Sequence, residues 1–99
     1  MTYQVRLLPR ARKEILDAFA WYEHHKTGLG EQFMEVVSEK INQVARAPER
    51  WPLRTARYRE AIVPVFPFLI IYRIQKGAKM VIISSIFHTA RNPRRKPGG

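Results

Sequence analysis

Basic and aromatic side chains gather in the strand-forming second half of the chain. Those that could recognise an anionic group are Arg54, Arg57, Tyr58, Arg59, Arg73, His88 and Arg91. Guanidinium groups bind phosphates and carboxylates, and a phenol or an imidazole can add a hydrogen bond. Taken singly, Arg73 could equally be a solvated strand charge, and His88 could be a half-buried structural residue. Taken together, these residues predict a surface that binds an anionic partner.

The distribution of charge supports this prediction. The chain has 18 Lys and Arg against 8 Asp and Glu, a formal net charge of +10. Basic and acidic side chains balance over residues 1–45, so the whole excess lies in residues 46–99. Such asymmetry indicates nucleic acid, an acidic protein segment or a membrane as partner, and the alternative is a solubilising charge with no particular partner. We expect no membrane partner, because no basic amphipathic helix contains the excess charge.

Other classes of site are not supported by residue spacing. The Gly28-Leu29-Gly30 stretch continues wrongly for a dinucleotide site. His24 and His25 are adjacent near a predicted helix end and point about 100° apart, so we expect them to face solvent. They do not form a metal site with His88, and the serines lack a nucleophile motif. We expect no metal and no cofactor.

Length and composition predict one small cytoplasmic domain. A chain of 99 residues is too short to divide into two self-sufficient cores. We assign residues 1–93 to a single domain and residues 94–99 to a flexible basic tail. The absence of cysteine fits a reducing compartment, and the N-terminus lacks the apolar segment of a secretory signal.

Two helices after a first strand must position the site. Residues 2–8 alternate as a strand does, and Pro9 suits the first position of a helix. Apolar residues at helical spacing then predict one helix up to Lys26 and a second from Leu29 to the region before Pro48. Gly28 favours a left-handed turn between them, so we expect an antiparallel helical hairpin.

Three strands follow the loop at residues 48–52. They are predicted at residues 58–63, 68–74 and 80–87, and the last two form a hairpin around Gly77. This pair is apolar on both faces and should lie inside the sheet. The predicted fold class is α+β, with the order β-α-α-β-β-β and the helical hairpin on one face of a small, mainly antiparallel sheet. We expect a basic concavity on the other face.

A two-residue turn in the last hairpin would set the pairing of its strands. Leu69 would then face Ile86, and His88 would lie on the same face as Leu69. Arg73 would share that face but stand about 13 Å away along the strand. His88 and Arg73 are therefore not expected to touch.

The aromatic residues at helical or strand spacing are expected in the core rather than at a stacking surface. Trp51, between proline and arginine in a loop, is the one expected to be exposed. The aromatic residues that we expect in the core are Phe19, Trp21, Tyr22, Phe33, Phe66, Phe68 and Tyr72.

Over nearly its whole length the chain resembles the RelE/ParE superfamily of toxins, and especially its ParE-like plasmid-stabilisation branch. The resemblance rests on an ordered set of short motifs: Trp21-Tyr22-Glu23, residues 28–33, Trp51-Pro52, Tyr58-Arg59, residues 66–74 and residues 86–93. It implies the fold described above and a bacterial toxin of a type II toxin–antitoxin system. It also implies a small antitoxin that wraps the toxin and neutralises it.

One position separates the two mechanisms known in the superfamily. In members that cleave mRNA on the ribosome, an arginine stands three residues before the tyrosine of the third strand. Here Leu69 occupies that position before Tyr72, so a site that needs positive charge has an apolar side chain. The resemblance therefore favours the branch that inhibits DNA gyrase by binding, without catalysis by the toxin.

The alternative is a RelE-like, ribosome-dependent mRNA endonuclease. In that case His88 would be the acid or base, Arg59 and Arg91 would hold phosphate, and Glu60 could act as a base. The expected partners are an acidic cognate antitoxin, with which the toxin could form a heterotetramer, and DNA gyrase. The ribosome and mRNA replace gyrase in the alternative, and positive charge suits either target.

Overall fold

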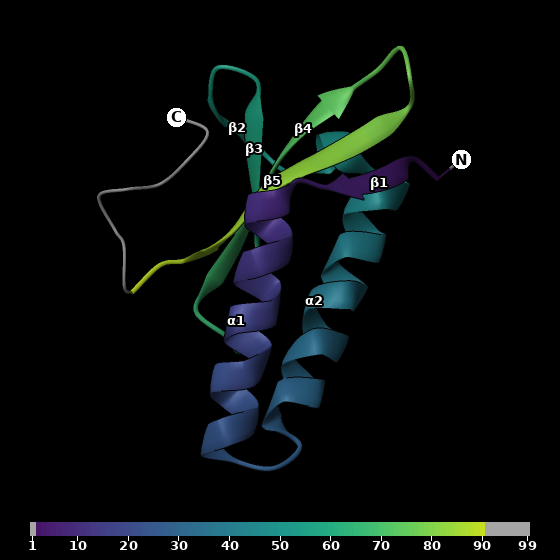
Figure 1. Cartoon of the computed structure of the whole chain (residues 1–99). Coiled ribbons are helices and arrows are strands. Elements are labelled where there is room, and N and C mark those ends of the chain that lie inside the picture. The colour runs from purple at the N-terminus through teal and green to yellow at the C-terminus, as the bar shows by residue number, and fades with distance from the viewer. Residues whose placement is uncertain (1, 91–99) are drawn as a thin grey trace.

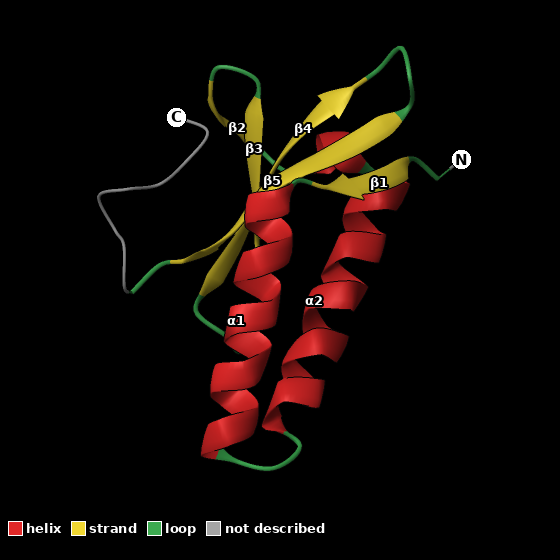
Figure 2. Cartoon of the chain, viewed as in Figure 1, coloured by secondary structure: helices red, strands yellow, loops and turns green. Residues whose placement is uncertain are grey.

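The chain folds into a helical hairpin packed on one face of a five-stranded sheet (Figure 1, Figure 2). The structure is a computed structural model that describes residues 2–90. Its elements are β1 (Gln4–Leu7), α1 (Pro9–His25), α2 (Leu29–Arg46), the 3-10 helix η1 (Pro48–Arg50), β2 (Leu53–Thr55), β3 (Tyr58–Ile62), β4 (Phe68–Gln75) and β5 (Met80–His88). The predicted order β-α-α-β-β-β is confirmed, with the short strand β2 added before the last three.

The sheet has the strand order β1-β5-β4-β3-β2. From β2 to β5, each strand pairs antiparallel with the strand that follows it in the sequence. In contrast, β1 runs parallel to β5, with Gln4 opposite Met80 and Leu7 opposite Ile83. A parallel pair needs a long connection, which the helices and the other strands provide. The prediction of a mainly antiparallel sheet, with β4 and β5 inside it, is confirmed.

Two glycines and one carboxylate shape the turn between the helices. Gly28 has φ of +91°, the left-handed conformation predicted for it. At Gly30 a Cβ atom would lie 2.7 Å from the carbonyl oxygen of Phe19, so the close crossing of α1 and α2 needs a glycine there. The Glu23 carboxylate accepts hydrogen bonds from the backbone N–H groups of Gly28 at 2.9 Å and Gly30 at 3.0 Å. Glu23 thereby satisfies backbone donors at the start of α2.

The core lies between the hairpin and one face of the sheet. Tyr72 is fully buried in it, and its hydroxyl donates a 2.6 Å hydrogen bond to the carbonyl oxygen of Pro48. This bond ties η1 to the middle of the sheet, and burial raises the pKa of Tyr72 to about 12. The other large buried side chains of the cluster are Ile15, Phe33, Val37, Val44, Val63, Phe66, Phe68, Ile70, Val81, Ile83 and Ile86.

An extra residue in β5 changes its register with β4. Near the turn Tyr72 pairs with Ile83, but Ile71 pairs with Ser85, which leaves Ser84 as a bulge. From there on, every partner is displaced by one residue, so Leu69 faces Phe87. The predicted pairing of Leu69 with Ile86 is therefore wrong, although the register assumed for the residues next to the turn is right.

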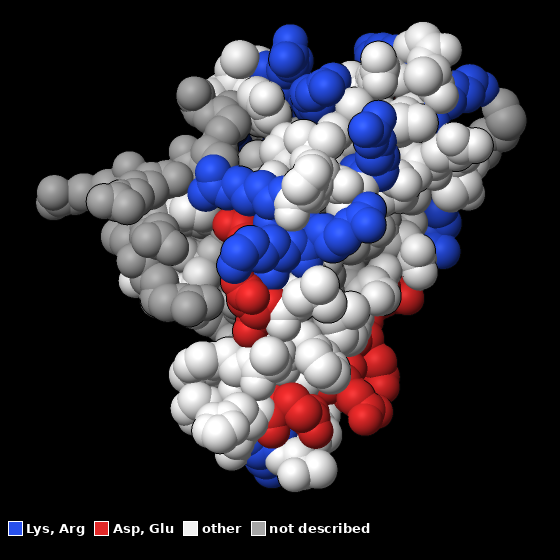
Figure 3. Space-filling model, viewed as in Figure 1, with Lys and Arg blue, Asp and Glu red and all other residues white. Residues whose placement is uncertain are grey.

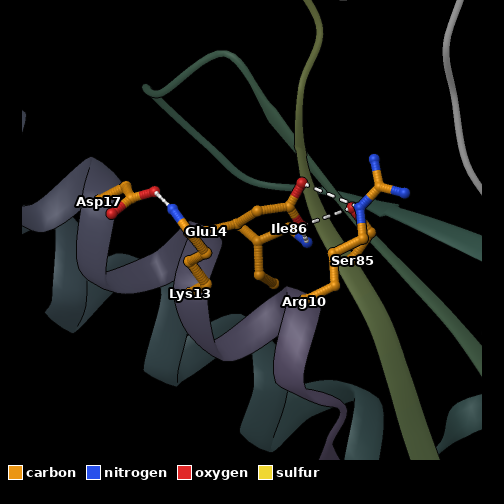
Figure 4. A network of polar contacts seen from close by, with 6 residues as sticks. All are labelled: Arg10, Lys13, Glu14, Asp17, Ser85 and Ile86. Carbon is orange, nitrogen blue, oxygen red and sulfur yellow. Dashed lines mark hydrogen bonds and ion pairs between the residues drawn. The ribbon is translucent and has the colours of Figure 1, made fainter.

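Glu14 of α1 accepts hydrogen bonds from the part of β5 that does not pair with β1. The pairing with β1 ends at Ile83, and beyond it the Glu14 Oε1 atom accepts hydrogen bonds from Ser85 Oγ at 2.7 Å and Ile86 N at 2.9 Å (Figure 4). Its other oxygen lies 3.4 Å from Arg10 Nε. The carboxylate thus fixes α1 against the strand that leads to His88.

Candidate functional site

Tyr58 and Arg73 lie side by side on the face of the sheet turned away from the helices. They are cross-strand partners in β3 and β4, and such partners project from the same face. Ala61 and Tyr72, their neighbours of opposite parity, belong to the core, so Tyr58 and Arg73 are on the outer face. Within residues 2–90 Arg73 makes no ion pair.

Two arginines of the β2–β3 hairpin complete this group. Arg54 Nε lies 3.9 Å from Glu60 Oε1, and the side chain of Glu60 is only 12% exposed. The Arg57 guanidinium lies over the Tyr58 ring, 5.9 Å from its centroid. We name Arg54, Arg57, Tyr58, Glu60 and Arg73 the outer-face cluster; it brings together five of the residues singled out in the sequence.

Arg59 points to the opposite face. It pairs with the buried Tyr72, and its Nη1 atom donates to the carbonyl oxygens of Trp51 at 2.6 Å and Glu49 at 3.4 Å. The guanidinium therefore holds the segment around η1 against the sheet. This geometry gives Arg59 a structural role, away from the outer-face cluster.

His88 also faces the helices, because the bulge at Ser84 reverses its expected side. It pairs with Phe68, and their rings meet edge to face with centroids 4.9 Å apart. Both rings line a cavity of about 260 Å³ together with Ala18, Trp21 and Tyr22, here named the aromatic pocket. The prediction that His88 shares a face with Leu69 is wrong.

The two tryptophans exchange their expected environments. Trp21 is 52% exposed and stacks on His25 with ring centroids 3.8 Å apart, whereas Trp51 is half-buried and packs against the core. Lys40 and Arg50 each approach the Trp51 ring to 5.5 Å. Exposure of His24 and His25 is confirmed.

Arg91, the domain boundary at residue 93 and the tail at residues 94–99 lie outside the described residues. Within residues 2–90, no three His, Asp or Glu side chains are grouped as metal ligands. No helix in the described part of the chain is long and apolar enough to cross a bilayer.

Leu69 lies in an apolar row across the outer face. Its partners on the two sides are Ile62, which is 70% exposed, and Phe87. At the β3 edge of this row is a hollow of about 270 Å³, lined by Lys40, Trp51, Pro52, Arg54, Glu60, Ile62 and Leu69. The basic side chains of this hollow, Lys40 and Arg54, come from α2 and β2. Leu69 itself offers only apolar surface.

A basic concavity lies where β1 leads into α1. It measures about 540 Å³ and is lined by Arg6, Leu7, Pro9, Arg12, Lys13, Leu16 and Asp17; we name it the β1–α1 groove. On the face of the molecule shown in Figure 3, Lys and Arg gather in the upper half, and Asp and Glu lie over the helices below. The balance of charge over residues 1–45 concealed this surface. The sequence feature that could have revealed this surface is the presence of four basic and no acidic residues among residues 1–13.

Comparisons with known proteins agree with this geometry. The sequence model of one family, described as the ParE toxin of the type II toxin–antitoxin system parDE, matches residues 5–93. A solved structure of the chromosomal ParDE system from P. aeruginosa superposes with a TM-score of 0.76 at 12% identity, covering 88% of this chain and 96% of that one. The RelBE2 toxin–antitoxin complex from Mycobacterium tuberculosis gives 0.66 at 24% identity, covering 89% and 92%. No curated protein matches in sequence.

Proposed function

Because the chain belongs to the ParE toxin family of type II toxin–antitoxin systems, we propose that it inhibits DNA gyrase by binding and that a cognate antitoxin neutralises it. The binding surface is the outer face of the sheet. The two similar structures are those of toxin–antitoxin systems, which supports an antitoxin as partner.

The observation that carries the proposal is the surroundings of Leu69. The side chain stands where the RNA-cleaving members of the superfamily have an arginine, and its cross-strand neighbours Ile62 and Phe87 are apolar. Cleavage of RNA needs cations at the developing negative charge on phosphorus. An apolar row at this position favours contact with a protein surface over catalysis.

The residues considered for an RNA-cleaving site do not converge. His88 lies in the aromatic pocket, and Arg59 is bonded to backbone carbonyl oxygens on the helix side of the sheet. Glu60 is on the outer face beside Arg54. A general acid, a base and a cation must reach one phosphate together, and these three side chains lie on two faces. Their separation supports inhibition without catalysis.

The outer-face cluster offers recognition chemistry in place of catalysis. Arg73 presents a guanidinium without an ion pair in the described part of the chain, next to the phenol of Tyr58. Arg54 and Arg57 extend the positive surface to the tip of the β2–β3 hairpin. Such a surface suits the gyrase–DNA complex, which presents phosphates beside protein.

The test compares two targets in parallel. Purified toxin is added to a gyrase supercoiling assay and to a translation reaction in which mRNA cleavage is followed. We expect loss of supercoiling or accumulation of cleaved DNA, with mRNA left intact. Cleavage of translated mRNA with gyrase unaffected would overturn the proposal. Loss of that cleavage in His88→Ala would then establish the endonuclease alternative.

Variants of the cluster test the surface. Arg73→Ala should reduce inhibition of gyrase at least tenfold, whereas Lys26→Ala, an exposed cation at the far end of α1, should leave it unchanged. Leu69→Arg should not increase toxicity, because the proposed action needs no charge at that position. A potency for Arg73→Ala equal to that of the unmodified toxin would remove the outer face from the proposal.

A further inference from the structure

We propose that the β1–α1 groove binds a segment of the antitoxin in which acidic residues alternate with aliphatic ones. This inference rests on the proposed neutralisation by an antitoxin and assigns it a surface. The groove lies at the start of α1, outside the half of the sequence that holds the net charge.

Uncompensated positive charge is the first reason. Lys13 forms a 2.7 Å ion pair with Asp17, the one acidic residue of the groove. Arg6 and Arg12 have no ion-pair partner among residues 2–90. Two free guanidinium groups in one concavity favour a ligand with carboxylates or phosphates.

Arg12 is also badly placed for the stability of α1. The first turn of α1 contains no acidic residue, and Leu8 at its N-cap position provides no side-chain hydrogen bond. Positive side chains near the positive end of a helix dipole are unfavourable, so Arg12 does not serve the folding of α1. A residue that breaks a local rule without structural gain is expected where function requires it.

The apolar part of the groove identifies the class of partner. Leu16 is 59% exposed and lies in the concavity beside Leu7 and Pro9. A sugar–phosphate backbone has no aliphatic group that packs well on such a surface, and among the described residues no aromatic side chain lines the groove to stack on bases. Carboxylates next to aliphatic side chains match both halves of the lining, which favours an acidic peptide over nucleic acid.

Arg6 connects the groove with the outer face. Arg6 pairs with Ile82, Ile82 with Arg73, and Arg73 with Tyr58, so the four side chains form one row across the sheet. A segment seated in the groove and bound to Arg6 ends at the margin of this row. The geometry gives a direct route to neutralisation: an antitoxin held by the groove extends over the surface that meets the target.

The experiment uses the full-length toxin and the antitoxin expressed from the reading frame next to the toxin's own. Arg12→Glu and Leu16→Asp should each weaken the complex at least tenfold in a calorimetric or fluorescence titration. Lys26→Glu, the same charge reversal at the other end of α1, should bind as the unmodified toxin does. Arg12→Glu places an acidic residue near the start of the helix, so it should not unfold the protein, and a thermal melt checks this.

The outcomes separate this proposal from the proposed function. Both groove variants should still inhibit gyrase, because neither residue belongs to the outer-face cluster. Unchanged antitoxin affinity in Arg12→Glu and Leu16→Asp would overturn the groove, whatever the target proves to be. Loss of duplex DNA binding in Arg12→Glu, with antitoxin binding intact, would assign the groove to nucleic acid instead. A toxin that binds its antitoxin through the groove but spares gyrase would contradict only the proposed function.

Discussion

Burial makes the hydroxyl of Tyr72 a weaker acid. In the folded chain its pKa is raised from 10.0 to about 12, mainly by burial, while nearby Arg59 acts in the opposite direction. A group that holds its proton more tightly when folded stabilises the fold below the unfolded pKa, and this contribution is lost as the pH rises through the folded pKa. The free energy of unfolding should therefore fall as the pH rises above 10, by about 3 kcal/mol in total once the pH has passed 12.

Alkaline titration of tyrosine absorbance, together with urea unfolding at each pH, measures both quantities. Tyr72→Phe should remove the late-ionising phenol and this part of the pH dependence. It should also destabilise the chain by about 1–3 kcal/mol at neutral pH, because the carbonyl oxygen of Pro48 loses its buried donor. The difference between the two titration curves is the ionisation of Tyr72, and a midpoint for it near pH 10 would show that Tyr72 ionises as an exposed tyrosine does.

Single residues were the hardest part of the site to predict from sequence. Tyr58 and Arg73 were singled out correctly as strand residues, and they are neighbours because β3 and β4 pair as a simple hairpin. His88 was placed on the wrong face, because one additional residue at Ser84 reverses the side of everything after it. Arg59 resembles a recognition residue in sequence, and only the carbonyl oxygens of Trp51 and Glu49 reveal its structural use.

The packing of α1 against α2 depends on Gly30. A methyl group at this position would lie 2.7 Å from the carbonyl oxygen of Phe19 and 2.9 Å from the Glu23 carboxylate. Gly30→Ala should therefore separate the helices and cost about 2–3 kcal/mol, in the range of overpacked interiors. The matched control is Gly77→Ala in the β4–β5 turn, where nothing lies within 4 Å of the added atom.

Chemical denaturation of the two variants gives the comparison directly. A loss for Gly77→Ala equal to that for Gly30→Ala would mean that the hairpin crossing is not close. Gly28→Ala is expected to lie between them. Its site is open, but its φ of +91° strains any residue with a side chain.

At the scale of elements, periodicity predicted both helices and the two long strands. Their apolar patterns extend over enough residues to be unambiguous. The strand β2 was missed because its three residues are all exposed and show no pattern. The parallel pairing of β1 could not be derived, since its partner β5 comes from the other end of the chain and local sequence does not encode such contacts.

The molecule as a whole separates its charges. Six of the eight acidic residues lie in α1 and α2, while the outer-face cluster and the β1–α1 groove hold basic residues at the sheet end. Figure 3 shows this polarity on one face. Binding of the free toxin to duplex DNA should therefore weaken steeply with salt. The logarithmic slope should fall by about 2 when Arg54 and Arg73 are both replaced by alanine.

Fluorescence anisotropy with labelled duplex DNA over a range of KCl concentrations measures this slope. Lys26→Ala serves as the control, because Lys26 lies at the end of the molecule formed by the helical turn (Figure 1). Parallel salt dependences for the double variant and the unmodified toxin would place the DNA contacts elsewhere.

The parallel pairing of β1 with β5 also bears on synthesis. β1 is made before β5, and among the described residues β5 is the only neighbour that β1 has in the sheet. A nascent chain that has not yet extended past Met80 therefore has a first strand without a partner, and contacts so distant in sequence form late. The β1–α1 groove, one wall of which is β1, is complete only once β5 has been made. The surface that we propose for the antitoxin is therefore finished only after β5 has been synthesised.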